Sequence, residues 1–276
     1  MSTTSLPEIR EAYAPPAIAA IYAALHEGIG IAQVNLIWRH AAALPGVLDW
    51  LWAQAAPALA SGAAAAARDA VAAAIALPIP AASPKPQDHA ALAALVEIYN
   101  RGNLTNLAVL SAILLRAQGM APGERPRPAP RGARLSAPPP LPRLAGLPPA
   151  QQAQIRALTA AHGLSDAAVV PSLYLHLAIW PDFLARLPDL LTPLHAEQRL
   201  QTARDAAVAA ARQAAPGLIA ALGPAPAPPA DLPAFLTRLE VFVREVIPGM
   251  VPVGLFLRRA LATAPSGGND DTLRFR

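Results

Sequence analysis

The sequence contains no cysteine, and aromatic residues make up only 5% of its 276 residues. Without cysteine the chain cannot form disulfide bonds, use a thiol nucleophile or carry a Cys-x-x-Cys redox pair. Charged residues are also scarce, at 14%, whereas apolar residues reach 54% and many of these are alanine. Alanine is the strongest helix former, and a chain of this length can bury a large core. The composition therefore predicts an all-α protein.

The net positive charge is concentrated in one segment. Lysine occurs once, and the formal net charge is +4. Residues 118–143 alone carry that net charge, from Glu124 and the arginines Arg125, Arg127, Arg131, Arg134 and Arg143. The rest of the chain is then roughly neutral and offers no basic face to a phosphate backbone. We predict a solvated, arginine-rich linker in this segment and no nucleic-acid partner.

Long hydrophobic runs of the transmembrane kind are also missing. The longest uncharged stretches, such as 50–67, consist mostly of alanine and include Gln54, Pro57 and Ser61. That composition is poor for spanning a bilayer, so we expect buried helices and no membrane partner. The N-terminus shows no basic-then-apolar signal pattern, which predicts a cytoplasmic location.

The sequence does contain an internal duplication, in which the second half repeats residues of the first. At an offset of 136 positions the two copies share His26 with His162, Val34 with Val170, His40 with His176, Pro45 with Pro181, and Arg68-Asp69 with Arg204-Asp205. At an offset of 143 they share Glu97 with Glu240, Arg101 with Arg244, and Arg116 with Arg259. Two copies of one unit usually pack about a pseudo-two-fold axis, and the cleft between them can hold one asymmetric site.

The duplication predicts the domain organisation. We expect a leader over 1–17, a first helical repeat over 18–117, a Pro/Arg-rich linker over 118–148, a second repeat over 149–262 and a polar tail over 263–276. Most of the 32 prolines fall between or at the edges of the expected helices, where the missing N–H is tolerated. Near the end of the first repeat, the pattern predicts two helices, over 88–100 and 105–118. The expected fold is a pseudo-dimer of duplicated helical units.

The sequence lacks the motifs of several common enzyme and metal-binding classes. There is no nucleophile elbow, phosphate-binding loop or dinucleotide fingerprint. None of the six histidines forms a His-x-x-x-His pair, so no metal site is expected. His40 and His176 occupy equivalent positions, which favours a shared packing role. Glu97 with Arg101, and likewise the equivalent pair in the second copy, is spaced for an intrahelical ion pair.

An asymmetric site should lie where the two copies differ. In the first copy, Asn35 and Trp38 are matched by Pro171 and Tyr174, and residues 103–106 are matched by the apolar 246–249. Asn103 and Asn106 are three residues apart, so both amides can share one helical face. Such amides in an apolar interior suggest a pocket for a compact polar molecule. Alternatively, the two asparagines cap the helix that follows.

Three segments resemble a known family. Residues 34–40 (VNLIWRH), 99–107 (YNRGNLTNL) and 177–184 (LAIWPDFL), together with the duplication, resemble the group I 2-haloacid dehalogenases over almost the whole chain. The resemblance implies an all-α pseudo-dimer with its site between the halves and no metal or organic cofactor. It also implies removal of halide from both enantiomers of 2-haloacids, by direct attack of a water that an aspartate activates.

The resemblance implies a set of site residues and one departure. The family's aspartate would fall within Ser172-Leu173-Tyr174, where no acid is present, and the nearest acids, Asp166 and Asp182, look like helix-start residues. An enzyme would then use His176 or a displaced acid as base. Asn103, Tyr174 and His176 are the expected catalytic residues; Asn35, Trp38, Asn106, Ser172, Leu173 and Ile247 are expected to bind the substrate.

Two functions stay open at this point. The protein is either a hydrolase of small 2-haloalkanoic acids or a non-catalytic relative that binds a small carboxylic acid or serves as a scaffold. The alkylhydroperoxidase-like helical proteins are a third resemblance, but their redox chemistry needs the cysteines that this chain lacks. We expect a monomer or a homodimer.

Overall fold

A computed structural model describes residues 6–80, 88–162 and 170–263. Within these ranges the regular structure is helical, without strands, which confirms the all-α prediction. The α-helices are α1 (Pro16–Ile29), α2 (Leu36–Ala42), α3 (Val47–Ala60), α4 (Ala63–Ala73), α5 (His89–Ala117), α6 (Pro149–Ala161), α7 (Ser172–Leu177), α8 (Pro181–Ala196), α9 (Arg199–Ile219), α10 (Leu232–Val241) and α11 (Ile247–Thr263). Short turns of 3-10 helix span Glu11–Tyr13 and Leu144–Gly146, and a π-helical turn, η3, spans Phe242–Val246.

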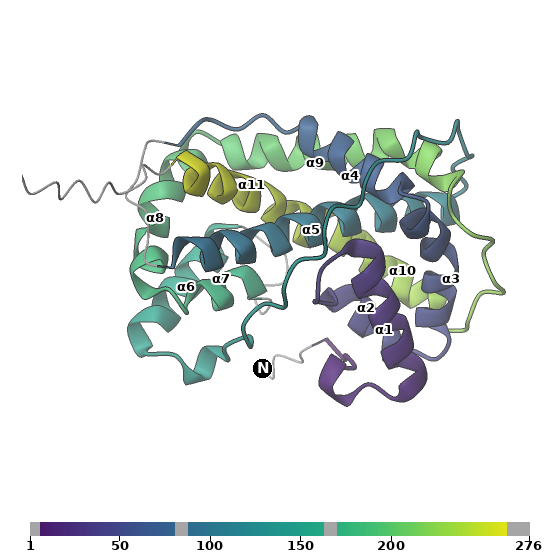
Figure 1. Cartoon of the computed structure of the whole chain (residues 1–276), viewed down its shortest axis with the longest axis horizontal. Coiled ribbons are helices and arrows are strands. Elements are labelled where there is room, and N and C mark those ends of the chain that lie inside the picture. The colour runs from purple at the N-terminus through teal and green to yellow at the C-terminus, as the bar shows by residue number, and fades with distance from the viewer. Residues whose placement is uncertain (1–5, 81–87, 163–169, 264–276) are drawn as a thin grey trace, which may run out of the picture.

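The long helix α5 runs through the middle of the molecule (Figure 1) and packs against α4, α9 and α11. Helices α1 to α3 and α10 lie toward one end of it, and α6 to α8 toward the other. Two hydrophobic clusters form the core. One joins α1 to α4 and the C-terminal half of α5 to α9, α10 and the start of α11; the other joins the N-terminal part of α5 to α6, α7, α8 and the rest of α11. Each cluster thus draws on both halves of the sequence.

Helix α5 is continuous where two helices were expected. The prediction placed a break at residues 101–104, but these residues lie inside one 29-residue helix. Gly102 lies inside this helix and is buried, and a Cβ at this position would lie 2.8 Å from Ile31 Cδ1. The glycine therefore lets the loop after α1 approach the helix closely, which costs less than interrupting it.

The expected leader packs onto the first helices. The carbonyl of Pro7 accepts a hydrogen bond from His40 Nδ1 at 2.8 Å, and the carbonyl of Ile9 accepts one from Tyr22 at 2.8 Å. Backbone Ile9 N–H also donates to Arg39 O. These contacts hold residues 7–9 against α1 and α2, beside the cavity described below.

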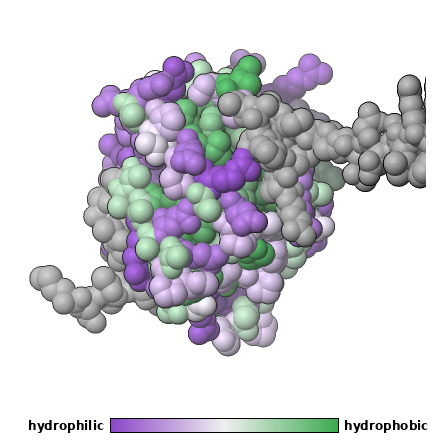
Figure 2. Space-filling view, turned by 90° about the vertical axis from the view of Figure 1, so that its left-hand side faces the viewer, coloured by the Kyte–Doolittle hydropathy of each residue, from purple (hydrophilic) through white to green (hydrophobic). Residues whose placement is uncertain are grey.

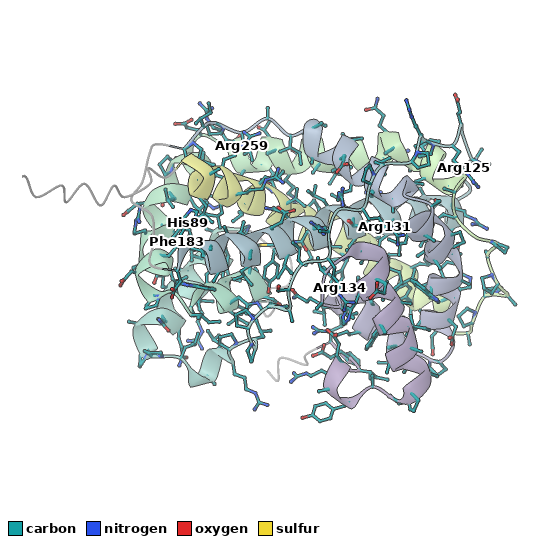
Figure 3. All side chains as sticks on the ribbon, viewed as in Figure 1. His89, Arg125, Arg131, Arg134, Phe183 and Arg259 are labelled. Atoms are coloured by element: carbon teal, nitrogen blue, oxygen red, sulfur yellow. The ribbon has the colours of Figure 1, made fainter. Side chains whose placement is uncertain are left out.

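Residues 120–143 form an extended segment that crosses the molecule (Figure 1). Its arginines lie along the segment (Figure 3) and bind other elements: Arg125 donates to Ala220 O, and Arg134 pairs with Glu27. The backbone is held as well, because Ala129 N–H donates to Gly62 O and Leu135 N–H donates to Gly30 O. The arginines of this segment that were expected to be solvated therefore include some that attach it to the helices.

The duplication stays a prediction, and the helix bounds agree with its offsets. Helices α2 and α7 begin at Leu36 and Ser172, and α4 and α9 begin at Ala63 and Arg199, each pair 136 positions apart. Helices α5 and α10 begin at His89 and Leu232, 143 positions apart. The predicted domain bounds likewise stay predictions, and the predicted tail from 264 onward lies outside the described residues.

No helix in the described ranges is long and apolar enough to cross a membrane. The end of the molecule seen in Figure 2 mixes hydrophilic and hydrophobic residues over its visible described surface. Strongly hydrophilic residues gather near its centre.

Candidate functional site

A cavity of about 90 Å³ lies where α2, α5, α7 and η3 meet. Its lining is divided between polar and apolar side chains. The polar residues are Gln33, Asn35, Arg39, Tyr99, Asn103 and Ser172; the apolar ones include Val34, Leu173, Phe242, Val246, Ile247 and Met250. A second space of about 20 Å³ shares Gln33, Asn35, Tyr99 and Asn103 and is bounded further in by Asn106.

Arg39 supplies the positive charge of this cavity. Its Nε lies 2.9 Å from Glu8 Oε2, and its side chain is 20% exposed. Glu8 also pairs with Arg10, whose side chain is 61% exposed, at 3.0 Å. One carboxylate thus serves two guanidinium groups. Because a guanidinium carries five N–H donors, the contact with Glu8 leaves donors of Arg39 for an anion in the cavity.

The loop before α2 is fixed by side chains that carry charge or cap the helix. Glu11 Oε1 accepts a hydrogen bond from Val34 N–H at 2.9 Å, and its other oxygen lies 2.8 Å from His26 Nε2. Burial acts to raise the pKa of Glu11, but the hydrogen bonds from His26 and Val34 outweigh it and lower that pKa. Asn35 Oδ1 accepts from Ile37 N–H and so caps α2. The Asn35 NH₂ group remains as a donor.

The two asparagines of α5 have different surroundings. Asn106 is 2% exposed, and its Oδ1 accepts a hydrogen bond of 2.8 Å from Trp38 Nε1. Asn103 lines both spaces, and within the described part of the chain its amide makes no hydrogen bond. Both lie in the middle of α5, so neither caps a helix. Trp38, expected at the pocket, is 1% exposed and lies outside the described lining of both spaces, where it holds Asn106 in place.

Tyr99 connects the cavity to a buried histidine. Its hydroxyl lies 2.6 Å from His176 Nδ1, and His176 Nε2 lies 2.8 Å from Pro139 O. A carbonyl can only accept, so Nε2 carries the hydrogen and Nδ1 accepts the Tyr99 O–H bond. Burial lowers the pKa of His176, although the bond to Pro139 opposes the shift, and the ring is neutral at pH 7.

The Tyr99 hydroxyl is also held from the cavity side. Burial raises its pKa, and hydrogen bonds from Gln33 and Ser172, together with the charge of Arg39, oppose that rise. The phenol is therefore protonated at neutral pH. Ser172 and His176 belong to α7, so this short helix supplies two of the partners.

Tyr174, expected in the site, faces another direction. It is fully buried, it lies outside the described lining of the cavity, and its hydroxyl bonds to Nε2 of His162. Its neighbour Leu173 is 1% exposed and does line the cavity, with Ile247 of α11. The π-helical turn η3 adds Phe242 and Val246 to this apolar side. Single π-helical turns within helices occur frequently at functional sites.

None of the described residues that line the cavity is an aspartate or a glutamate. Asp182 lies exposed in the first turn of α8, outside that lining, and Asp166 lies outside the described residues. Nor does the described part of the chain bring three histidine or acidic side chains together as a metal site. The cavity thus combines one guanidinium and several amides with an apolar side, an arrangement that suits the anion of a small organic acid.

Comparisons with known proteins identify the fold. A structure described as a complex of D-2-haloacid dehalogenase with L-LA superposes with a TM-score of 0.75 at 16% identity, covering 93% of this chain and 96% of that chain. The fold is that of the D-2-haloacid dehalogenases. A mutant D-2-haloacid dehalogenase has a TM-score of 0.74 at 15% identity, covering 93% of this chain and 96% of that chain. A mutant with D-2-CPA has a TM-score of 0.71 at 15% identity, covering 95% and 96%. No family model and no curated protein matches the sequence.

Within this haloacid dehalogenase fold the expected residues divide into two groups. The first group lines the cavity or the adjoining space and comprises Asn35, Asn103, Ser172, Leu173, Ile247 and Asn106. The second group lies outside the described lining of both spaces and comprises His176, Trp38 and Tyr174. The sequence prediction missed Arg39, Tyr99 and Gln33. Arg39 lies inside the segment that carried the resemblance, and an arginine beside two expected site residues was a signal for acid binding. Tyr99 begins the segment 99–107 that carried the resemblance, but it was not expected as a site residue.

Proposed function

We propose that the protein binds a small 2-substituted carboxylic acid in the cavity between α2, α5, α7 and η3. The observation that carries this proposal is the lining of that cavity, which holds Arg39 and free amide donors but no acid among its described residues. A carboxylate entering it gains charge-assisted hydrogen bonds and meets no like charge in that lining. We choose this class of ligand by analogy with the haloacid dehalogenases that share the fold.

The cavity sets an orientation for such an acid. In this orientation Arg39 and the amides of Asn35 and Asn103 bind the carboxylate, and the lining residues Leu173, Ile247 and Phe242 contact the alkyl group and the 2-substituent. The volume of about 90 Å³ limits the ligand to a few heavy atoms. Larger acids should therefore be excluded.

Hydrolysis of a 2-haloacid is a second candidate function, and the Tyr99 to His176 hydrogen bond is the observation that favours it. A cavity water would attack C2 while the carbon–halogen bond breaks and halide leaves with the electron pair. The water would lose one proton to the Tyr99 oxygen as Tyr99 passes its own to His176 Nδ1, giving a 2-hydroxy acid and an imidazolium. The lowered pKa of His176 and the raised pKa of Tyr99 oppose this relay, so we place binding before hydrolysis.

Calorimetric titration with 2-chloropropionate and with its neutral counterpart, 2-chloropropionamide, tests the binding proposal. The acid should bind and the amide should bind at least about tenfold more weakly, because only the acid gains the charge-assisted contact with Arg39. Equal affinities, or no binding of the acid, would contradict the proposal.

Halide release from each enantiomer of 2-chloropropionate tests hydrolysis. Tyr99→Phe removes the relay hydroxyl, and we expect it to lower the rate of release about 100-fold or more, as loss of general base catalysis does. The matched control is Tyr22→Phe, because the Tyr22 hydroxyl is also buried and hydrogen bonded but lies outside the cavity. Absence of release by the unaltered protein, or an equal loss in both variants, would rule the relay out while leaving the binding proposal to the titration.

A further inference from the structure

A second cavity, of about 260 Å³, lies beside the junction of α8 and α9. Its described lining consists of Ala161, His162, His195, Gln198, Leu200, Gln201, Arg204 and Gly249, none of which lines the acid cavity. Two histidines and an arginine from three different parts of the chain therefore share one hollow. Neither the fold nor the proposed function accounts for them.

The two imidazoles are close to each other and to a positive charge. The rings of His162 and His195 are 5.9 Å apart between centroids, edge to face. Burial lowers the pKa of His162 to about 4, and the nearby His195 and Arg204 contribute in the same direction. Burial also lowers the pKa of His195. Burial thus keeps both imidazoles neutral, and the positive charge of Arg204 in the same lining argues against a cation as the ligand.

The hydrogen bonds of His162 leave a donor for a ligand. Its Nε2 is bonded to the hydroxyl of Tyr174, a side chain that is fully buried. When the phenol donates to Nε2, the neutral imidazole carries its hydrogen on Nδ1 and can donate it to a ligand. His195 makes no hydrogen bond with the described residues through its ring, so both of its nitrogens are available there.

Helix α9 adds backbone donors. It begins at Arg199, and Leu200 and Gln201 of its first turn line the cavity. The first N–H groups of a helix have no partner within the helix, and the helix dipole favours negative charge at this end. The N-cap residue Gln198 has φ of 53°, in the left-handed region, and makes no side-chain capping hydrogen bond. The end of the helix is therefore uncapped where it meets the histidines.

The charged groups of this region have partners of their own. Asp205 accepts from Gln201 Nε2, and Glu197 pairs with Arg199. Arg204 donates one Nη2 bond to Arg244 O at 3.1 Å and keeps further donors. In the described lining the charge is thus positive only.

From these groups we infer that the cavity formed by His162, His195, Arg204 and the start of α9 binds a tetrahedral oxyanion, either as a free ion or as the phosphoryl or sulfuryl group of a small molecule. Arg204 and the backbone N–H groups bind the anion at neutral pH, with the imidazoles as neutral donors. Below neutral pH the anion stabilises the imidazolium forms, so binding takes up protons and strengthens as the pH falls.

Sulfate is the probe of choice, because its charge stays constant between pH 5 and pH 8. Calorimetric titrations at constant ionic strength should show sulfate binding at least about threefold more tightly at pH 5.5 than at pH 7.5. Arg204→Gln should weaken binding about tenfold or more, as loss of one charge-assisted hydrogen bond does. The matched control is Arg199→Gln, whose arginine begins the same helix but pairs with Glu197 and does not line the cavity. Equal weakening by both substitutions would overturn the inference, because it would indicate unspecific attraction.

A measurement on the unaltered protein does not depend on how the variants fold. Sulfate should raise the pKa values of His162 and His195 in imidazole nitrogen NMR spectra and leave the signals of His89 unchanged. Unchanged pKa values at saturating sulfate would overturn the inference. Phenyl phosphate, titrated in parallel, distinguishes the sources: tighter binding than sulfate assigns the cavity to a phosphorylated small molecule, and equal binding assigns it to the free ion.

Discussion

Replacement of Arg39 by glutamine removes the only cationic side chain in the described lining of the acid cavity while keeping a side chain that can donate hydrogen bonds. A hydrogen bond to a charged group contributes about 1.5–3 kcal/mol. We therefore expect Arg39→Gln to weaken 2-chloropropionate binding by about 10- to 150-fold, since about 1.4 kcal/mol corresponds to a factor of ten. The affinity for the neutral 2-chloropropionamide should change much less. Calorimetric titration of both ligands measures the difference.

The structure offers a close control in Arg10. Arg10 and Arg39 contact the same carboxylate of Glu8, at 3.0 and 2.9 Å, but Arg10 lies outside the described lining of the cavity and is 61% exposed. Arg10→Gln should leave the affinity for 2-chloropropionate within about twofold, because an exposed ion pair contributes little. If both variants lose affinity equally, the effect comes from Glu8 and the leader, and the assignment of Arg39 to the carboxylate is refuted.

Three further predictions concern the apolar lining of the acid cavity, the contact between α5 and α11, and the pH dependence of stability. Leu173→Asp should create halide release from 2-chloropropionate where the parent has little, because it places a carboxylate in the cavity lining; a stably folded variant without added release would contradict this. Gly254→Ala should lower stability by about 1–3 kcal/mol in thermal unfolding, because a Cβ would collide with Asn100, whereas Gly146→Ala, with nothing within 4 Å, should change it little. In the folded protein His162 is neutral and its pKa is lowered to about 4. Its contribution to the free energy of unfolding should therefore be full above about pH 6.5 and be lost as the pH falls toward 4. Denaturant titrations in which His162→Gln shows the same pH dependence of stability as the parent would refute this prediction.

The helical class could be predicted from the sequence, because the alanine content that favours helices is a local property. The break expected within α5 was wrong for a tertiary reason. Gly102 contacts the Ile31 loop, and a single sequence does not show which glycines serve close packing. The π-helical turn Phe242–Val246 was not predicted either, since apolar spacing does not distinguish it from the α-helices on either side.

The candidate site was predicted in part. Comparison of the two sequence copies led to Asn35, Asn103 and Ser172, because divergence between copies marks an asymmetric environment. The comparison could not predict which of several neighbouring side chains faces the cavity. Trp38 and Arg39 are neighbours, yet the helix turns Trp38 into the core, toward Asn106, and Arg39 toward the cavity. That choice depends on packing between α2 and α5, which sequence spacing alone leaves open.

The most direct test of acid binding is a crystal structure of the protein with 2-chloropropionate. We predict that the carboxylate lies between α2, α5 and α7, within hydrogen-bond distance of Arg39 and Asn103, with the chlorine and methyl groups against Leu173 and Ile247. An acid bound at another place, with this cavity empty or filled by side chains, would contradict the account.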